Sequence, residues 1–488
     1  MPELLIHGAA GETRLPFSDE PLLSDLLANH PDSPGKPCGG GGKCGQCAVY
    51  ASGALFPVPD ENGKVLSCQA RLCGDAEVWL PRHKAMKQIE TEAKGEAYPL
   101  SPLIGQYALA VDIGTTTLAM RLIRLSDGAI LSTVASENPQ RTMAADVIGR
   151  IEGALNGRLE LLTSMIQESL HEMEAEAIRL AGLPIQSADY RIITGNTTML
   201  YLFTHRSPEC LSRAPFQADC LFDYWNGRDY YPPCAGAFVG ADITCALLFS
   251  GICSKNDTAL LIDIGTNGEI ALWHNGKISC CATAAGPAFE GGGIECGCGS
   301  IPGAISSAKA IHGEISYTTI ENEEAKGICG SGLIDLTAAM LDLEMLDESG
   351  ILDNDEIIFS PNAKLTQKDI RQIQLAKGAI AAGIRSLVHH AEITMKDITA
   401  LYIAGGFGSH LNLQSAARIG LIPEELLDKA VVLGNASLGG AQRLLLDNGA
   451  SQRIRDLTQN TECLNLASSP FFSDAFIECM MFESSTTA

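Results

Sequence analysis

Four cysteines near the start of the chain have the spacing of an iron–sulfur site. Cys38, Cys44 and Cys47 form a C-x5-C-x2-C pattern in a glycine-rich loop, and Cys68 follows twenty-one positions later. Four thiolates supplied as three plus one can hold a [2Fe–2S] cluster. The glycines of the loop tolerate left-handed backbone, so the chain can wrap closely around the inorganic sulfides. We therefore predict that these four cysteines are the metal ligands of a one-electron carrier.

The fourth ligand has a rival in Cys73, five residues beyond Cys68. Cys68 is preferred, because the stretch Leu-Ser-Cys-Gln around it resembles the sequence around the last ligand of ferredoxins. We expect Cys73 to pack against the domain instead.

The remaining cysteines are more scattered. A cysteine-rich chain without an export signal is expected to use its thiols as metal ligands or buried side chains, not as disulfides. One loose group lies in the middle of the chain: Cys280, Cys281, Cys296, Cys298 and Cys329. A second metal site there stays an open alternative, but buried thiols explain the group better, since cysteine is among the most commonly buried residues.

Two similar segments suggest phosphate binding. Asp112-Ile-Gly-Thr-Thr-Thr and Asp263-Ile-Gly-Thr-Asn-Gly resemble the two phosphate loops of the superfamily that contains acetate kinase, sugar kinases, Hsp70 and actin. By this resemblance Asp112 and Asp263 are the catalytic residues and hold Mg²⁺ through water, which suits a hard cation. Backbone, hydroxyl and amide donors to phosphate are expected from the residues that follow them. These are Gly114, Thr115, Thr116, Thr117, Gly265, Thr266 and Asn267.

A third segment fits the same superfamily. The apolar run Leu401-Tyr-Ile-Ala ends in glycines and resembles the superfamily's adenosine loop. Gly405, Gly406 and Gly408 would let the backbone lie against the adenosine. One Asp-x-Gly turn is weak evidence, whereas three such segments in the right order predict an ATP site.

The elements that position these residues fall into three parts. Residues 1–82 are predicted to form a small α+β domain resembling a β-grasp ferredoxin, with strands near residues 3–8, 48–50 and 76–80 and a helix at 20–29. The charged, proline-containing stretch 83–106 is predicted to be a linker.

Residues 107–488 are predicted to be a duplicated α/β domain. Residues 108–115 and 259–266 are apolar strands with the same Asp-Ile-Gly-Thr ending, so two similar halves should enclose a cleft. Helical periodicity is strongest over Leu159–Leu180 and Asp369–His390.

Length and composition exclude some functions. A chain of 488 residues should contain two to four domains. A net charge of −24 disfavours nucleic acid as a partner, since such binding usually needs a basic face. No apolar run is long enough for a membrane helix and no signal peptide is evident, so we expect a cytoplasmic protein.

The whole arrangement resembles the reductive activators of corrinoid proteins. Three further segments look like that family's ATPase domain: Gly195–Met199, Gly286–Gly292 and Gly327–Gly332. The resemblance implies a multidomain α/β protein: a β-grasp [2Fe–2S] ferredoxin domain followed by a duplicated actin/Hsp70-like (ribonuclease H-like) ATPase domain with two subdomains. A separate middle domain is expected to be absent or reduced.

The resemblance also implies a function. Such a protein passes one electron from its [2Fe–2S] cluster to the inactive Co(II) of a corrinoid protein and regenerates Co(I) for methyl transfer, using ATP and Mg²⁺. Its partners would be that corrinoid protein of a methyltransferase system, an external low-potential electron donor and a second copy in a homodimer. Glu290 and Asn196 are candidates for positioning the attacking water, although either could cap a turn.

Three alternatives stay open. The chain could activate another enzyme, in the manner of the activators of 2-hydroxyacyl-CoA dehydratases. It could be a small-molecule kinase with a redox-regulatory domain. It could also be a redox sensor that turns over no ATP.

Overall fold

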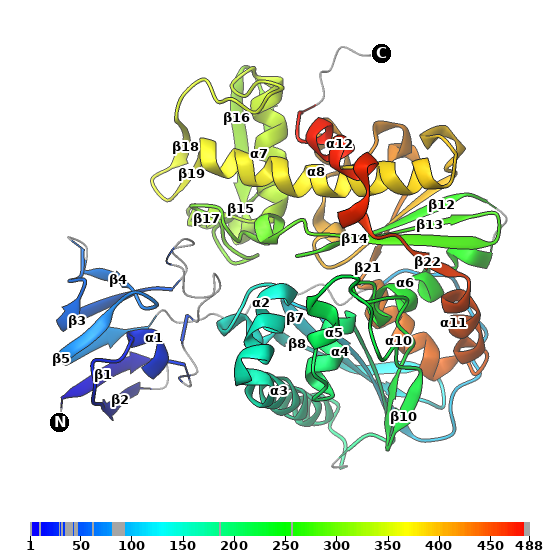
Figure 1. Ribbon diagram of the computed structural model, residues 1–488, viewed down its shortest axis with the longest axis horizontal. Helices are drawn as coiled ribbons and strands as arrows, with labels where there is room; N and C mark the ends of the chain where they lie inside the picture. The colour runs from blue at the N-terminus through cyan, green and yellow to red at the C-terminus, as the bar shows by residue number, and fades with distance from the viewer. Residues whose placement is uncertain are drawn as a thin grey trace.

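A computed structural model of the chain describes residues 2–8, 11–28, 30, 33–34, 42, 47–60, 63–80, 93–184, 187–254 and 257–482. They form a small unit from 2 to 80 and a large unit from 93 to 482 (Figure 1). Cys38, Cys44 and the first part of the expected linker, 83–92, lie outside the described residues.

The small unit is a mixed five-stranded sheet with the order β2-β1-β5-β3-β4. Its core follows from alternation along the strands, because successive side chains point to opposite faces: Val49 and Ala51 are buried while Tyr50 is exposed. The helix expected at 20–29 is shorter, since Leu22 pairs with Arg71 at the sheet and the helix begins only after it. The elements are β1 (Glu3–Gly8), β2 (Gly11–Pro16), α1 (Leu23–Leu26), β3 (Ala48–Phe56), β4 (Lys64–Leu66) and β5 (Arg71–Trp79).

The first sheet of the large unit has the order β10-β11-β9-β6-β7-β8. Helix α3 spans Leu159–Leu180, the range that its periodicity predicted. Its apolar stripe, which includes Leu162, Ile166 and Leu170, packs on one face of the sheet. The elements are β6 (Tyr107–Ile113), β7 (Thr117–Arg124), β8 (Ala129–Glu137), α2 (Val147–Gly153), α3 (Leu159–Leu180), β9 (Tyr190–Gly195), α4 (Thr197–Phe203), α5 (Glu209–Ser212), β10 (Tyr224–Asn226), β11 (Asp229–Tyr231) and α6 (Ala241–Ser250).

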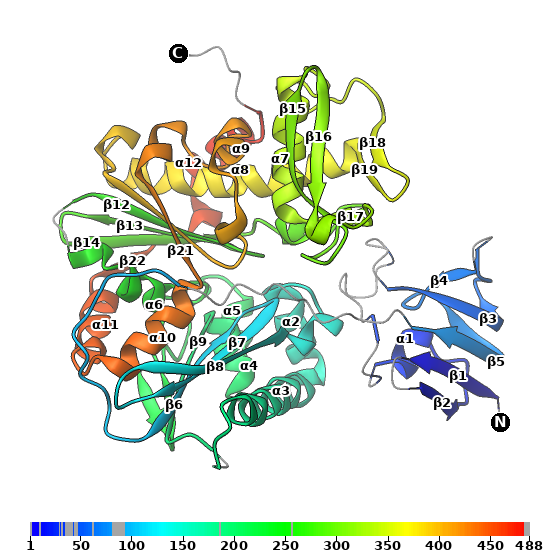
Figure 2. The ribbon, with the colours of Figure 1, turned by 180° about the vertical axis from the view of Figure 1, so that it is seen from behind.

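The second sheet has the order β21-β20-β12-β13-β14-β22. The predicted helix at 369–390 is confirmed as α8, which begins two residues earlier because Thr366 and Asp369 form a capping box. Helix α8 covers the outer face of this sheet (Figure 2). The elements are β12 (Ala259–Ile264), β13 (Gly268–His274), β14 (Lys277–Thr283), α8 (Gln367–His390), β20 (Ala400–Ala404), α9 (Leu413–Arg418), β21 (Ala430–Gly434), α10 (Ala436–Leu446), α11 (Ala450–Gln459), β22 (Thr461–Cys463) and α12 (Pro470–Cys479).

An insertion between β14 and α8 extends the second sheet's side of the molecule. It contains a three-stranded sheet, a two-stranded sheet and one helix. The elements are β15 (Ala304–Ile311), β16 (Glu314–Thr319), β17 (Gly327–Ile328), α7 (Gly330–Asp342), β18 (Glu356–Ser360) and β19 (Ala363–Thr366).

The two sheets are built alike, which confirms the predicted duplication. In each, three antiparallel strands (β6-β7-β8 and β12-β13-β14) have a parallel strand beside the first of them (β9 and β20). Helix α6 lies between the sheets (Figure 1). Apart from Asp242, its sequence is largely apolar, as a helix buried on all sides requires. Cys245 and Leu248 pack toward the first sheet, and Ile243 and Leu247 toward the second.

The second part of the expected linker is anchored to the large unit. The amide of Lys94 donates to the carbonyl of Leu433, and that of Ser101 to the carbonyl of Leu446. Residues 93–106 are therefore extended but held along the large unit and are not a free tether.

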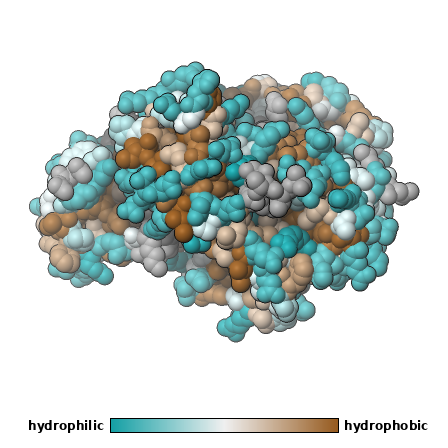
Figure 3. All heavy atoms as spheres, turned by 90° about the horizontal axis from the view of Figure 1, so that it is seen from above, coloured by the Kyte–Doolittle hydropathy of each residue, from teal (hydrophilic) through white to brown (hydrophobic). Residues whose placement is uncertain are grey.

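No helix in the described part of the chain combines the length and the apolar character needed to cross a membrane. The face seen from above mixes hydrophilic and hydrophobic residues (Figure 3).

Candidate functional site

One cavity of about 440 Å³ is lined by residues from both sheets of the large unit. Nearly all the residues predicted to bind nucleotide line it. They are Asp112, Gly114, Thr115, Thr116, Thr117, Asp263, Gly265, Thr266, Asn267, Gly405 and Gly406. The exception is Gly408, which begins a 3₁₀ turn and is not among the lining residues.

The duplication places the two aspartates. Asp112 is the penultimate residue of β6 and Asp263 that of β12, so equivalent positions of the two sheets bring both carboxylates to the cavity. The Asp112 carboxylate accepts hydrogen bonds from the Ser437 hydroxyl at 2.8 Å and the Asn435 amide at 3.1 Å. Burial nevertheless raises the pKa of Asp112.

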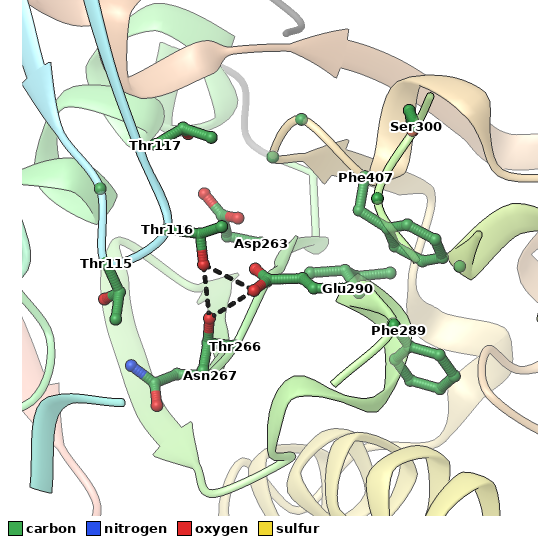
Figure 4. A pocket seen from close by; sticks show the side chains of 18 of the residues that line it. Thr115, Thr116, Thr117, Asp263, Thr266, Asn267, Phe289, Glu290, Ser300 and Phe407 are labelled. Atoms are coloured by element: carbon green, nitrogen blue, oxygen red, sulfur yellow. Dashed lines mark hydrogen bonds between the residues drawn. The ribbon is translucent and has the colours of Figure 1, made fainter. Parts of the chain in front are cut away.

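A carboxylate joins the two phosphate-loop candidates. The Glu290 Oε2 atom accepts hydrogen bonds from Thr116 Oγ1 at 2.5 Å and from Thr266 Oγ1 at 2.9 Å. The two hydroxyls lie 3.1 Å apart (Figure 4). Donors from both loops thus converge on one anionic oxygen, which is the chemistry that a phosphate oxygen also requires.

The base of the cavity is crowded with buried carboxylates. Burial and the nearby Asp112 charge raise the pKa of Asp263 to about 7. Burial and the charge of Asp263 raise the pKa of Asp242 to about 8, and burial raises that of Glu269 well above its usual value. Within the described ranges, no three of these side chains are close enough to chelate a metal directly. A cation bound there would therefore need further oxygen ligands, such as water or phosphate oxygens.

These pKa shifts predict how stability depends on pH. The pKa values of Asp242 and Asp263 are raised above 3.8, so the folded protein holds protons that the unfolded chain releases. The free energy of unfolding should therefore fall as the pH rises toward about 7 and about 8, by about 1.4 kcal/mol per pH unit for each group. Thermal melts of the Mg²⁺-free protein from mildly acidic to mildly alkaline pH will measure this, because the slope holds below the raised pKa values and levels off above them. Asp263→Asn should flatten the profile, and an equally flat profile in the unaltered protein would contradict the shifts.

Sequence reasoning missed four charged residues of the cavity: Glu137, Arg141, Asp242 and Glu269. Two of these residues could have been found from the sequence. Glu269 is a lone charge in an apolar strand, and Asp242 is the one charged residue of the largely apolar helix α6. Arg141 left no such signal. It is the only arginine or lysine among the lining residues, and it is now paired with Glu137 at 3.2 Å.

Glycine is required at position 405 and favoured at position 265 for different physical reasons. Gly405 has φ +92°, and a Cβ there would lie 2.5 Å from the Asp263 carboxylate, so packing within the protein requires it. A Cβ on Gly265 would have no protein atom closer than 3.7 Å. Space for a ligand, rather than packing within the protein, is the better explanation for Gly265.

The three segments that carried the family resemblance also reach the cavity. Asn196, Phe289, Glu290 and Ser331 line it, one or more from each segment. Phe289 stacks on Phe407 beside the glycines of the third loop, with ring centroids 5.6 Å apart (Figure 4).

In the small unit, the structure brings together two of the four predicted cluster ligands. Cys47 and Cys68 are both buried, and their sulfur atoms lie 3.2 Å apart. Cys73 is exposed on β5, so the expectation that it packs against the domain is wrong. The strand alternation explains this, because its neighbour Leu72 takes the buried face.

The middle cysteines do not gather into one group. Cys298 and Cys329 line the cavity, where burial raises the pKa of Cys298 to about 12. Cys281 is buried between β14 and α8, and Cys280 lies against a cysteine far along the chain, Cys463. The described residues hold no cluster of three metal ligands.

The fold and the cavity define an actin/Hsp70-like ATPase. Residues 257–488 match the family described as the C-terminal domain of RACo, the ASKHA domain, and residues 107–255 match the RACo middle region. The chain therefore belongs to the RACo family. We expected a separate middle domain to be absent or reduced. A RACo middle region is in fact matched by residues 107–255, and these residues form the first sheet and its helices.

Comparisons with individual proteins agree with the family match. The chain is 27% identical to the corrinoid activation enzyme RamQ of Eubacterium limosum, over 96% of this chain and 98% of RamQ. It is 26% identical to the Co(II) methylated amine-specific corrinoid protein reductase of Methanosarcina barkeri, over 76% of each. A solved structure of a reductive activator for a corrinoid, iron–sulfur protein is 25% identical, with a TM-score of 0.73, over 99% of this chain and 98% of that one.

Proposed function

We propose that this protein reactivates a corrinoid protein by reducing its Co(II) to Co(I), with the electron supplied through a [2Fe–2S] cluster and the reaction driven by ATP. The observation that carries the proposal is the match to RamQ, a corrinoid activation enzyme, over nearly the full length of both chains. The second relative is likewise a Co(II) corrinoid protein reductase.

The cavity suits MgATP. We infer that Asp112 and Asp263 hold Mg²⁺ through water, since Mg²⁺ usually keeps several waters and few direct carboxylates. Thr116 and Thr266 donate to phosphate oxygens, and Arg141 offsets part of the polyphosphate charge. A cation would also offset the burial and the repulsion by Asp112 that raise the pKa of Asp263.

The small unit suits an iron–sulfur cluster. We propose that residues 1–82 are a ferredoxin-like domain and that Cys38, Cys44, Cys47 and Cys68 bind the cluster. The buried contact between the thiols of Cys47 and Cys68 supports this, because thiolates of one cluster must lie close together. Bound there, the cluster supplies one electron at a time.

ATP is needed because the electron transfer is uphill. Plant-type clusters have reduction potentials of about −400 mV. Each 59 mV by which the potential of the acceptor lies below that of the cluster lowers the one-electron equilibrium constant about tenfold. We infer that the nucleotide-bound protein binds the corrinoid partner best in the state that favours Co(I). The shift in equilibrium cannot exceed the difference between its affinities for the two states.

The direct test mixes reduced protein, MgATP and a Co(II) corrinoid protein and follows the cobalt absorption spectrum. Co(I) should accumulate above an ATP-free control. A small-molecule kinase would instead phosphorylate a metabolite stoichiometrically. No gain in Co(I) with any of several corrinoid proteins would overturn the proposal.

Glu290 is proposed to position the attacking water once a phosphate displaces it from the two threonines. Glu290→Gln should lower ATP turnover by roughly 100-fold while leaving nucleotide affinity nearly unchanged, since a general base typically contributes 10²–10⁴-fold. Steady-state hydrolysis and nucleotide titration together measure this. Asn196 is a weaker candidate, because its side chain already caps α4 and bonds Glu269. Normal turnover in Glu290→Gln would remove this role.

The proposal includes two more partners. We propose an external low-potential electron donor, because the protein must be re-reduced after each turnover. We also propose a homodimer, which light scattering of the purified protein will test.

A further inference from the structure

Two cysteines 183 residues apart meet at the edge of the second sheet. Strand β14 pairs with the edge strand β22 in parallel, and Cys280 is the register partner of Cys463. Their sulfur atoms lie 3.1 Å apart. Neither residue lines the cavity, and the ATPase function proposed above does not use them.

The geometry permits a covalent bond. A disulfide needs a sulfur–sulfur distance of about 2.05 Å and Cα atoms about 4.4–6.8 Å apart. Neighbouring strands lie about 4.7–4.9 Å apart, within that range. The sulfur atoms therefore need to approach by only about 1 Å, which side-chain rotation and small strand movements can supply.

The two thiols differ in the way that a reactive pair requires. Cys463 is an exposed residue, and the hydrogen bond from Cys280 lowers its pKa. Cys280 is buried, and the hydrogen bond to Cys463 together with burial raises its pKa. Attack by thiolate controls disulfide chemistry, so Cys463 is the attacking thiol and Cys280 the resolving thiol.

We propose that Cys280 and Cys463 are a redox-active pair that closes to a disulfide in the folded protein. With a small disulfide as oxidant, the Cys463 thiolate attacks one sulfur and releases the other half as a thiolate. Cys280 then loses its proton and attacks the Cys463 sulfur, which releases the second half. The two cysteines lose two electrons and two protons in all, and the oxidant becomes two thiols.

The pair sits where it can influence the cavity. The Cys463 thiol donates a hydrogen bond at 3.3 Å to the carbonyl of Ala235, in the segment that leads into α6 and Asp242. The next carbonyl along this segment, that of Gly236, accepts from the hydroxyl of Thr197 at 2.6 Å. A disulfide has no S–H group, so oxidation removes the donor that ties the edge of the second sheet to this segment.

Strand β22 is also a crossing point between the two sheets. The helix before it, α11, packs on the first sheet through Ala450 and Ile454. The helix after it, α12, packs on the second sheet's core through Phe472. A covalent bond at this position would fasten β22, which links α11 on the first sheet to α12 on the second, to its neighbouring strand β14 (Figure 1).

The test uses the full-length protein with its cluster, equilibrated with mixtures of oxidised and reduced dithiothreitol. Free thiols are then alkylated, and the peptides are mapped by mass spectrometry. A cross-linked pair of peptides containing residues 280 and 463, lighter by two hydrogens and restored by reductant, supports the proposal. Complete alkylation of both cysteines at every ratio overturns it.

Variants separate the pair from general oxidation. We expect ATP turnover to fall when the cross-link forms. Cys280→Ser and Cys463→Ser should each abolish both the cross-link and this fall in ATP turnover, while turnover under reducing conditions is kept. Cys479→Ser, a half-buried thiol on α12 beside Arg385, should retain both effects. Cross-linking with unchanged ATP turnover would overturn the coupling to the cavity. None of these readouts needs a corrinoid protein, so they are independent of the function proposed above.

Discussion

Asp263→Asn is expected to lower ATP turnover and ATP-driven cobalt reduction by about 10- to 100-fold, while the cluster stays intact. Groups that act on a metal even through its outer shell are typically worth 10–100-fold, and Asp263 is buried at the cavity. ATP hydrolysis and Co(I) formation report the loss, and the visible spectrum of the cluster reports that the small unit is unaffected.

Stability distinguishes this loss from misfolding. Replacing a buried, repelled carboxylate by a neutral amide should raise the melting temperature of the Mg²⁺-free protein at neutral pH, not lower it. Asp257→Asn is the matched control, because Asp257 is exposed just before the same strand. If Asp263→Asn hydrolyses ATP and reduces cobalt normally, the magnesium assignment is wrong.

Cys68→Ser is expected to abolish the cluster signal and cobalt reduction while ATP hydrolysis by the large unit continues. The large unit has its own core and cavity, whereas Cys68 belongs to the core region of the small unit. Iron content and the paramagnetic resonance of the reduced protein measure the cluster. Both should fall to near zero if the ligand set is correct.

Cys73→Ser is the control for this variant, since Cys73 is the rival ligand and is exposed on β5. It should retain the full cluster signal. The opposite pattern, with the signal kept in Cys68→Ser and lost in Cys73→Ser, would reassign the fourth ligand to Cys73.

Local pattern was enough to predict much of the fold. The range of α3 followed from an apolar stripe with the helical period, because that stripe is the face it buries against the first sheet. The duplicated Asp-Ile-Gly-Thr segments predicted two equivalent strands, and β6 and β12 are those strands. The helix near residue 20 was overestimated, since Leu22 pairs with the sheet, a contact that no local pattern records.

The sequence alone determined the chemistry at the motifs: the cysteine spacing, the two aspartate loops and the glycine-rich third loop. Only the tertiary structure decided what surrounds them. It placed Asp242, Glu269 and Arg141 in the same cavity, joined Thr116 to Thr266 through Glu290, and set Cys280 against Cys463. The physical reason is that motifs lie within a few consecutive residues. Burial, charge repulsion and thiol contact depend instead on side chains far apart in the sequence, which come together only when the sheets form and pack on α6.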